Sequence, residues 1–375
     1  MKQDYERYFN NEQIIKNAED ALMTAPVHIT DEKSPICTEH PHCYCSFGDY
    51  WWKNPDTDDG LPYVKRDGES NPDNFNFHRL TLRRMRTSVS RLAIAYRLFG
   101  DERYATHATR MLREFFLDRD TYMEPHLLYA QGIPGVCLGR GIGIIDTLHL
   151  TELPFAIDAL RGSAAMTDNI YGGLREWFSD YLDWITTHPY GLAEKNEPNN
   201  HGICWHVQAL SFAKFVDRQS VIDECIDRYR TVILPMQMRL DGAFPLELQR
   251  TKPYNYSIFA LDNTVTIVHL AALCGEDLWS FALRDGRSIQ TGLNFMLPFL
   301  ENKSNWPLPP DIEHFDELPA RASFMLFSGL HYRDERYLKL YESLAADTPD
   351  AEIRRNLAIR EPLLMLPSLP ISSGR

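Results

Sequence analysis

The sequence predicts an all-α protein in which helical hairpins form a ring or a bundle. From about Phe77 onward, apolar residues recur at intervals of three and four, which is the spacing of one face of an α-helix. No runs rich in β-branched residues alternate with these helices, so a parallel sheet is not predicted. About ten helices joined by short turns favour hairpins, and the lack of a clean internal repeat disfavours a regular solenoid.

The first 75 residues contain one predicted helix and one long irregular stretch. Residues 2–24 place their apolar residues on one side of a helix: Tyr8, Ile14, Ile15, Ala18 and Leu22. Residues 25–75 have no helical or strand period. A stretch of this length in a compact protein is usually functional or disordered. Its aromatic residues favour function over disorder: Tyr44, Phe47, Tyr50, Trp51, Trp52 and Tyr63.

The rest of the chain is predicted to be helical, with one interruption. A helix that begins near Phe77 is expected to end at Gly100, and Asp101 is a suitable N-cap for the next helix. Residues 120–146 form a second irregular stretch. Further helices are predicted near residues 147–162, 167–187, 200–217, 219–236, 255–275, 286–300, 317–331 and 334–346. We expect residues 1–375 to form a single domain.

The charge of the chain excludes some partners. With 39 Lys and Arg against 52 Asp and Glu, the net charge is −13, so no bulk attraction to nucleic acid or to anionic membranes is expected. We also expect no run of residues that spans a bilayer. A polyanionic substrate would need a local basic cleft, for which the sequence offers Arg66, Arg79, Arg83, Arg84, Arg86, Arg140, Arg239 and Arg250. The oligomeric state is not predicted.

The N-terminus and the cysteines bear on the compartment. The first residues are charged and polar, without the apolar region of a signal peptide. If Met1 is the natural first residue, the protein is expected in the cytoplasm; if a signal peptide has been removed, it is expected in the periplasm or outside the cell. Seven scattered cysteines, an odd number, fit a reducing compartment better than a disulfide framework.

Four polar residues form the main candidate site. Asn200 and His201 open a predicted helix, where free backbone N–H groups and the helix dipole favour an anion. Arg250 and Tyr256 lie in a polar, aromatic segment that is poor core material. Taken singly, such an Asn is more often an N-cap and such a His an ordinary polar residue. In combination they predict an acid/base site that handles a carboxylate.

Removal of a proton from the carbon next to a carboxylate requires two things. The carboxylate charge must be neutralised, for which Asn200 and Arg250 are candidates. A base must reach the proton, and either a Tyr256 phenolate or a neutral His201 could serve. The ordinary pKa of tyrosine, about 10, is too high for ready ionisation. We expect the neighbouring Arg250 to lower the pKa of Tyr256.

Three other segments carry weaker signals. Residues 48–52 and 60–68 mix aromatic and charged residues, as in a wall of sugar subsites or a packed loop. Residues 37–45 contain Cys37, His40, His42, Cys43 and Cys45, which could hold zinc or copper. No second ligand pair follows in the sequence, so ordinary loop packing is preferred and no metal is predicted. Residues 124–131, with Arg140 and Asp146 after them, could bring further polar groups to a cleft or simply connect two helices.

Several motifs together resemble the alginate-lyase superfamily of polysaccharide lyases, and in particular the group that includes glucuronan lyases. The motifs are GDYWWKNPD (48–56), GLPYVKRDGESNPD (60–73), Tyr129-Ala-Gln131, GRGIGIIDT (139–147), NNHG (199–202), DGAFPLELQRT (241–251) and NYS (255–257). They cover roughly residues 35–300. Arg250 and Tyr256 are six residues apart, whereas mannuronate-specific alginate lyases have a slightly longer gap and a His-Tyr-His ending, which leaves the sugar open.

The resemblance implies a fold, an activity and a set of site residues. The fold would be an incomplete (α/α) toroid with long irregular loops forming the cleft. The activity would be β-elimination at 1,4-linked uronic acids, without a cofactor. Asn200 and Arg250 would neutralise the carboxylate, and His201 and Tyr256 would be the acid/base pair. We expect substrate contacts from Asn199, Tyr50, Trp51, Trp52, Tyr63, Arg66, Tyr129, Gln131, Arg140 and Tyr254.

The predicted function is therefore a lyase that cleaves β-1,4-linked D-glucuronate or D-mannuronate chains by syn elimination, with an acidic polysaccharide or oligosaccharide as its partner. One alternative is a glycoside hydrolase on a similar toroid, with Asp49 and Glu247 as its two carboxylates. Another is a protein that binds acidic oligosaccharides without catalysis.

Overall fold

The computed structural model describes residue 8 and residues 10–366, and they form two compact units. Within the described part, the first unit contains the residues up to 48, residues 73–190 and those from 359 onward. The second unit contains residues 49–72 and 191–358. The chain therefore passes between the units four times, and neither unit is one continuous stretch. The single domain predicted from the sequence stays a prediction.

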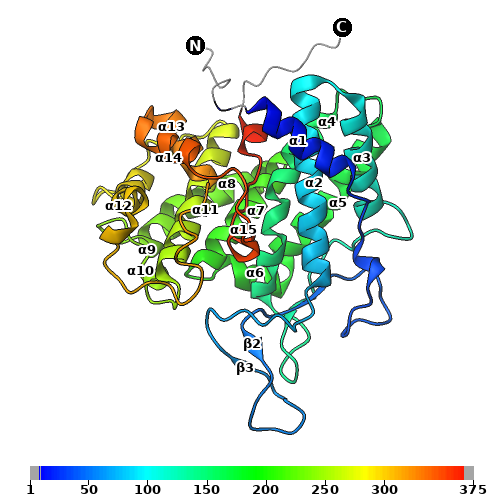
Figure 1. The fold of residues 1–375 in the computed structure, drawn as a ribbon, viewed down its shortest axis with the longest axis horizontal. Coiled ribbons are helices and arrows are strands. Elements are labelled where there is room, and N and C mark those ends of the chain that lie inside the picture. The colour runs from blue at the N-terminus through cyan, green and yellow to red at the C-terminus, as the bar shows by residue number, and fades with distance from the viewer. Residues whose placement is uncertain (1–7, 9, 367–375) are drawn as a thin grey trace. The chain divides into compact units, whose positions relative to one another are not determined.

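The first unit is built around helix α2 (Phe77–Phe99), which packs against α1 (Asn11–Leu22), α3 (Glu102–Phe116) and α4 (Leu153–Leu160). Figure 1 shows the dark blue α1 lying across the cyan α2. Helix α5 (Asp168–Thr187) packs against α3. The described part of this unit also contains the 3-10 segments η2 (Ile29–Asp31), η3 (Gly141–Glu152) and η6 (Pro362–Met365).

The junction between α2 and α3 agrees with the sequence prediction. Gly100 adopts a left-handed conformation with φ of 70°, and its N–H donates to the Tyr96 carbonyl. Glycine reaches this conformation without steric cost, which is why it ends helices. The Asp101 side chain then accepts a hydrogen bond from the N–H of Arg103 and caps α3.

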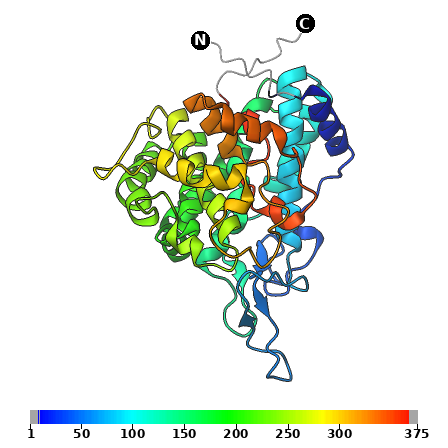
Figure 2. The same cartoon turned by 60° about the vertical axis from the view of Figure 1, so that its left-hand side comes forward.

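The second unit is built around α11 (Pro253–Leu273), nearly all of which is buried. It packs against α7 (Asn200–Phe215), α10 (Pro245–Leu248), α12 (Ile289–Glu301) and α13 (Ser323–Tyr332). Helix α14 (Glu335–Ser343) forms a hairpin with α13, which is visible as paired orange ribbons in Figures 1 and 2. The remaining helical elements are α6 (Pro189–Lys195), α8 (Gln219–Arg228), η4 (Tyr229–Ile233), α9 (Leu234–Gln237), η5 (Lys303–Asn305) and α15 (Ala351–Arg355).

Helix α11 also has the length and apolar composition of a membrane span, with a mean hydropathy of 1.3. No run of this kind was expected from the sequence. The apolar window of α11 is 78% buried inside the protein. A helix that is apolar on all sides is expected to be buried in the core of a folded unit. The burial of α11 agrees with that role.

The strands are few and short. In the first unit, β1 (Cys45–Phe47) pairs in parallel with β4 (Tyr129–Gly132). In the second unit, β2 (Trp51–Trp52) pairs antiparallel with β3 (Val64–Lys65), and together they form the small hairpin labelled in Figure 1. Between residues 25 and 75, all of which are described, the regular structure consists of η2 and the strands β1, β2 and β3. This agrees with the lack of a helical or strand period in that part of the sequence.

Some predicted boundaries were wrong. The helix expected at 219–236 is interrupted by a π-helical turn, Tyr229–Ile233. The helix expected from 317 begins at Ser323, because Pro319 disfavours helical backbone at the residue before it and lacks an N–H to donate. Residues 141–152 are a 3-10 segment, whereas a loop followed by an α-helix was expected. Helix α1 starts at Asn11, and residues 2–7 and 9 of its predicted range lie outside the described residues.

Candidate active site

The helix α7 begins at the Asn-Asn-His-Gly motif, as the sequence predicted. The side chain of Asn199 caps the helix by accepting a hydrogen bond from the His201 N–H at 2.9 Å. Gly202 permits the preceding turn to fold back closely, because a Cβ there would lie only 2.2 Å from the carbonyl oxygen of Glu197. The motif thus fixes the directions in which the side chains of Asn200 and His201 project from the start of α7.

His201 is oriented by a buried carboxylate. Its Nδ1 lies 2.8 Å from Oε1 of Glu194, which is fully buried at the end of α6. Burial by itself disfavours the charged imidazolium, but the charge and hydrogen bond of Glu194 outweigh it, with smaller contributions from Glu197 and Glu247. The pKa of His201 is therefore raised. Within the part of the chain that the structure describes, Nε2 of His201 has no protein partner, so this nitrogen can face a substrate.

Asn200 is fixed just as firmly by Glu247. The backbone N–H and the side-chain Nδ2 of Asn200 each donate to one carboxylate oxygen of Glu247, both at 2.8 Å. Glu247 lies in α10 and is only 2% exposed. Its backbone carbonyl accepts from the N–H of Arg250 at 3.2 Å. Glu247 therefore links the start of α7 to the segment that carries Arg250.

Arg250 makes two kinds of contact. Its Nε and Nη2 donate to the two carboxylate oxygens of Asp67 at 3.1 and 2.9 Å, and Nη2 also donates to the Tyr256 hydroxyl at 2.9 Å. These contacts use Nε and Nη2; among the described residues, Nη1 has no partner. Gly68 makes this arrangement possible, because its φ is 83° and a Cβ would lie 2.3 Å from Oγ1 of Thr251.

The Tyr256 hydroxyl belongs to a chain of four side chains. It lies 2.8 Å from the hydroxyl of Tyr50, and Arg355 donates from Nη2 to that second hydroxyl, also at 2.8 Å. Arg355 comes from α15 and donates from Nη1 to Asp49 at 2.8 Å. Two phenols thus lie side by side, with one guanidinium on each flank.

Arg250 acts on the pKa of Tyr256 in the expected direction, but the net shift of that pKa is upward. Burial raises the pKa of Tyr256 well above the ordinary value, and the neighbouring Tyr50 adds to this, while Arg250 and Arg355 only partly oppose it. The guanidiniums fall short because each already faces a carboxylate, Asp67 or Asp49, whose charge offsets its own. In the resting protein Tyr256 is consequently a neutral phenol.

The residues of the second unit that were expected to bind substrate have different surroundings. Trp52 donates from its indole nitrogen to the carbonyl of Glu69, and the Arg66 guanidinium lies over its ring at 4.9 Å. Trp51, Trp52 and Tyr63 are partly exposed, and Arg66 is exposed. These positions, together with Asn199 and Tyr50, stay predicted substrate contacts.

Tyr254 is different, because it is fully buried. Its hydroxyl donates to the carbonyl of Phe299, and its ring packs against Trp306 and Phe315. The structure therefore places Tyr254 in the core, contrary to the predicted substrate contact. The reason is the helical period: Tyr254 and Tyr256 are two residues apart in α11 and point to different sides of it.

Tyr129, Gln131 and Arg140 belong to the first unit. Gln131 donates to Asp146, and the Arg140 guanidinium donates to the backbone and side-chain oxygens of Gln131 at 2.9 and 3.0 Å. Asp146 also accepts from Tyr44 and Ser46. Gln131 and Arg140 thus help to hold β4 and η3 together, and a substrate contact from these three residues stays a prediction.

Sequence reasoning missed three members of the site. Asp67 lies within the segment 60–73 that the motifs marked, but nothing singled it out from its acidic neighbours. Glu194 is six residues before Asn200 in a helix that was not predicted. Arg355 is 305 positions away from Tyr50, and the short charged helix α15 gives no local signal of function.

The contacts of Asp49 and Glu247 do not favour the hydrolase alternative. A hydrolase needs one protonated carboxyl and one carboxylate that face the sugar. Here both oxygens of Glu247 accept hydrogen bonds from Asn200, and Asp49 is paired with Arg355. Both carboxylates therefore hold other site residues in place.

Comparison with known proteins gives a consistent result. A profile of the alginate lyase family matches residues 28–306. The crystal structure of an alginate lyase from Bacteroides ovatus matches with a TM-score of 0.85 and 32% sequence identity, over 95% of this chain and 93% of that one. A comparison with curated protein sequences gives no match.

Two more distant structures show the same fold. An alginate lyase from Sphingomonas species A1 matches with a TM-score of 0.54 and 15% identity, over 86% of this chain and 88% of that one. An alanine variant of that enzyme, complexed with a tetrasaccharide, matches with a TM-score of 0.53, also at 15% identity and over the same shares of the two chains.

Fold and site together define a polysaccharide lyase of the all-α toroid class, and this fold class, predicted from the sequence, is confirmed. The chain belongs to the alginate lyase family.

Proposed function

We propose that the protein cleaves β-1,4-linked chains of D-mannuronate or D-glucuronate by syn β-elimination and leaves a 4,5-unsaturated uronate end. Membership of the alginate lyase family supports the reaction, and alginate lyases among the similar structures support a uronate polymer as substrate. The observation that carries the mechanism is the Tyr256 hydroxyl, which lies within hydrogen-bond distance of both Arg250 and Tyr50.

Tyr256 acts as both base and acid in this proposal. The resting phenol first loses its proton to water. The phenolate then removes the proton from C5 of the uronate, a double bond forms between C4 and C5, and the bond from C4 to O4 breaks. The phenol then returns the same proton to the leaving O4. The phenolate is stabilised while it exists, because Arg250 and Tyr50 both donate to its oxygen and Arg355 donates to Tyr50.

The substrate carboxylate is neutralised by three groups. Nη1 of Arg250 offers two N–H donors, and the second hydrogen on Nδ2 of Asn200 offers another. The raised pKa of His201 favours its charged, protonated form, which places a positive charge beside the substrate. We therefore assign His201 to charge neutralisation and Tyr256 to proton transfer, with neutral His201 as the alternative base.

The stereochemistry follows from the single acid/base residue. In D-mannuronate and D-glucuronate, H5 and O4 lie on the same face of the ring, so one phenol reaches both. In L-guluronate they lie on opposite faces, and one phenol does not. A mismatch of even about 3 kcal/mol in the barrier would separate the rates by more than a hundredfold.

A substrate panel tests the proposal. Purified protein is incubated with polymannuronate, glucuronan, polyguluronate and alginate, and the ultraviolet absorbance of the conjugated double bond is followed. We expect absorbance to grow with polymannuronate or glucuronan and to stay low with polyguluronate. Equal rates on polyguluronate would contradict the single-residue mechanism and would require His201 as a separate base on the opposite face. Release of reducing ends without absorbance would contradict elimination.

A further inference from the structure

Two loops of the first unit converge beside the parallel pair of strands β1 and β4. The strands align Cys45 with Tyr129, so the residues just before each strand leave the pair at the same end. Cys43 precedes β1 by two residues, and Glu124 and His126 lie shortly before β4. A backbone hydrogen bond of 2.9 Å from the Glu124 N–H to the His42 carbonyl holds the loops together.

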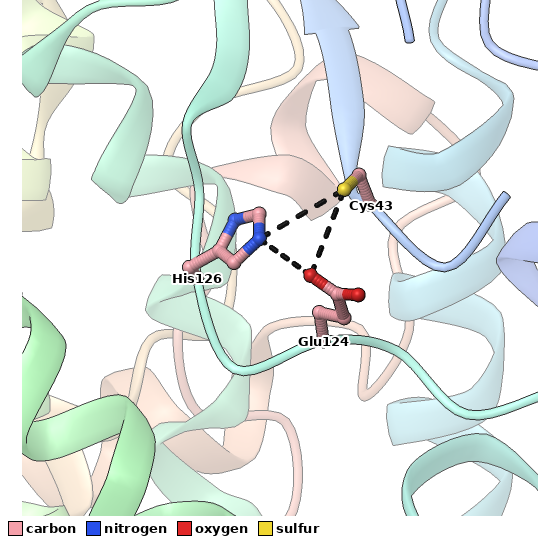
Figure 3. Close-up of side chains that lie close together, drawn as sticks. All are labelled: Cys43, Glu124 and His126. Atoms are coloured by element: carbon pink, nitrogen blue, oxygen red, sulfur yellow. Dashed lines mark hydrogen bonds and ion pairs between the residues drawn. The ribbon is translucent and has the colours of Figure 1, made fainter. Parts of the chain in front are cut away.

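Three side chains from these loops point toward one another, as Figure 3 shows. Sγ of Cys43 lies 3.7 Å from Oε2 of Glu124 and 3.8 Å from Nε2 of His126. The same Nε2 lies 2.7 Å from the same Oε2. One sulfur, one nitrogen and one oxygen thus surround a single point. Cys43 is buried, and Glu124 and His126 are partly buried.

Two of the three separations are close to those around a tetrahedral zinc ion, and the third would have to widen. Zinc-ligand bonds of about 2.3 Å to sulfur and about 2.0–2.1 Å to nitrogen and oxygen place the sulfur about 3.6 Å from the other two donors. The observed 3.7 and 3.8 Å are close to this value. The separation of nitrogen and oxygen, now 2.7 Å, would open to about 3.4 Å around the ion. The other ring nitrogen of His126, Nδ1, accepts a long hydrogen bond of 3.4 Å from the Leu128 N–H. A contact of this length favours one tautomer of the imidazole only weakly.

The geometry does not fit a cysteine nucleophile with a histidine base. In that arrangement, one ring nitrogen of the histidine faces the thiol and the other faces the carboxylate. Here Nε2 of His126 faces both Cys43 and Glu124. Burial and the adjacent Glu124 also raise the pKa of the Cys43 thiol, which is the opposite of activation.

A second buried thiol, Cys37, belongs to the same loop as Cys43 but does not join these three donors, which all lie within 4.8 Å of one another. All seven cysteines are free, so neither thiol is held in a disulfide. The histidines of the 37–45 segment do not take part: His40 is exposed, and His42 bonds through Nδ1 to the Tyr122 carbonyl at 2.6 Å. Glu124 and His126 are the second pair of ligands, which was not recognised from the sequence.

We propose that Cys43, Glu124 and His126 bind a Zn²⁺ ion, with the fourth position of the tetrahedron left to a water molecule. Sulfur, imidazole and carboxylate are ligands that zinc binds, at the bond lengths used above. The ion ties the loop before β1 to the loop before β4. It takes no part in the elimination, so this inference is independent of the proposed function.

Zinc content, measured by mass spectrometry of the full-length purified protein, tests the inference. We expect about one zinc per chain, removal by a strong chelator, restoration by added Zn²⁺ and a higher melting temperature with the ion. Cys43→Ser and His126→Gln should weaken zinc binding by about tenfold or more. The controls His40→Gln, in the same segment, and Cys225→Ser, a buried thiol in α8, should bind zinc as the unaltered protein does.

Cobalt substitution keeps the test decisive if a variant fails to fold. Co²⁺ bound to the unaltered protein should give the charge-transfer absorption of a cobalt–thiolate bond, and added Zn²⁺ should remove it. The proposal is overturned if the protein binds neither ion, if bound cobalt shows no thiolate band, or if Cys43→Ser binds zinc as tightly as the control variants.

Discussion

At the scale of single residues, the site consists of groups that hold one another in place. Glu194 orients His201, Glu247 orients Asn200, and Asp67 orients Arg250. Each of these carboxylates satisfies donors that would otherwise be buried without partners. Burial and the adjacent Tyr50 raise the pKa of Tyr256, and this gives the enzyme a pH dependence that can be measured.

Arg355→Gln should move the pH profile of kcat/KM to higher pH. Arg355 is one of two cations that lower the pKa of Tyr256, so its loss raises that pKa further. Because the phenolate is the active base, its fraction at a given pH falls, and the acid-side limb shifts toward alkaline pH. Arg355→Lys keeps the charge and should shift the limb less. A limb that stays in place while kcat falls equally at every pH would show that Arg355 only positions Tyr50.

The sequence identified some of these residues for physical reasons that are local. Arg250 and Tyr256 are six residues apart, so a short segment brings them together, and the Asn-Asn-His-Gly motif marks the start of a helix. Arg355 and Glu194 could not be found in this way. Their roles depend on contacts made only after the chain has folded, and a single sequence carries no trace of such contacts.

At the scale of elements, the start of α7 decides whether the site can form. The carbonyl of Glu197 approaches Gly202 so closely that no side chain fits between them. The apolar period of α7 was readable from the sequence, and so was its N-cap. The close approach of the preceding turn was not, because it depends on the position of the short helix α6.

Gly202→Ala should destabilise the protein by about 1–3 kcal/mol, because the new Cβ would overlap the Glu197 carbonyl oxygen. It should also displace His201 and lower kcat. Gly172→Ala is the matched control: Gly172 lies in α5 with nothing within 4 Å of the new Cβ. It should be neutral or stabilise the protein by up to about 1 kcal/mol. Denaturant unfolding measures both, and equal stabilities of the two variants would contradict the close approach.

At the scale of the whole molecule, the sequence was a good guide to the fold class and a poorer one to long-range contacts. The recurrence of apolar residues over most of the chain predicted helices, and the match to solved structures confirms the all-α toroid. Helix ends set by capping, such as Gly100 and Asp101, were predictable. The π-turn at Tyr229–Ile233, which no side-chain cap marks, was not predictable.

Chelator treatment of the whole protein separates stability from catalysis. The proposed elimination uses Arg250, Asn200 and His201 to neutralise the substrate carboxylate, so a chelator should leave kcat unchanged at moderate temperature. It should lower the melting temperature, because the proposed zinc ties two loops of the first unit. Loss of activity that a divalent ion restores, while the protein stays folded, would show that a metal takes part in the reaction, and the roles given to Arg250 and Asn200 would then be wrong.

The central claim is that the Tyr256 hydroxyl transfers the proton, and kcat of Tyr256→Phe on polymannuronate or glucuronan tests it most directly. The change removes one oxygen and leaves the ring in place, so folding should be retained while kcat falls by roughly 10²–10⁴-fold. Tyr254→Phe is the matched control. It removes a hydroxyl bonded to the Phe299 carbonyl, so it should lower stability by about 1 kcal/mol and leave kcat nearly unchanged. Near-normal activity of folded Tyr256→Phe would contradict the account and make His201 the base.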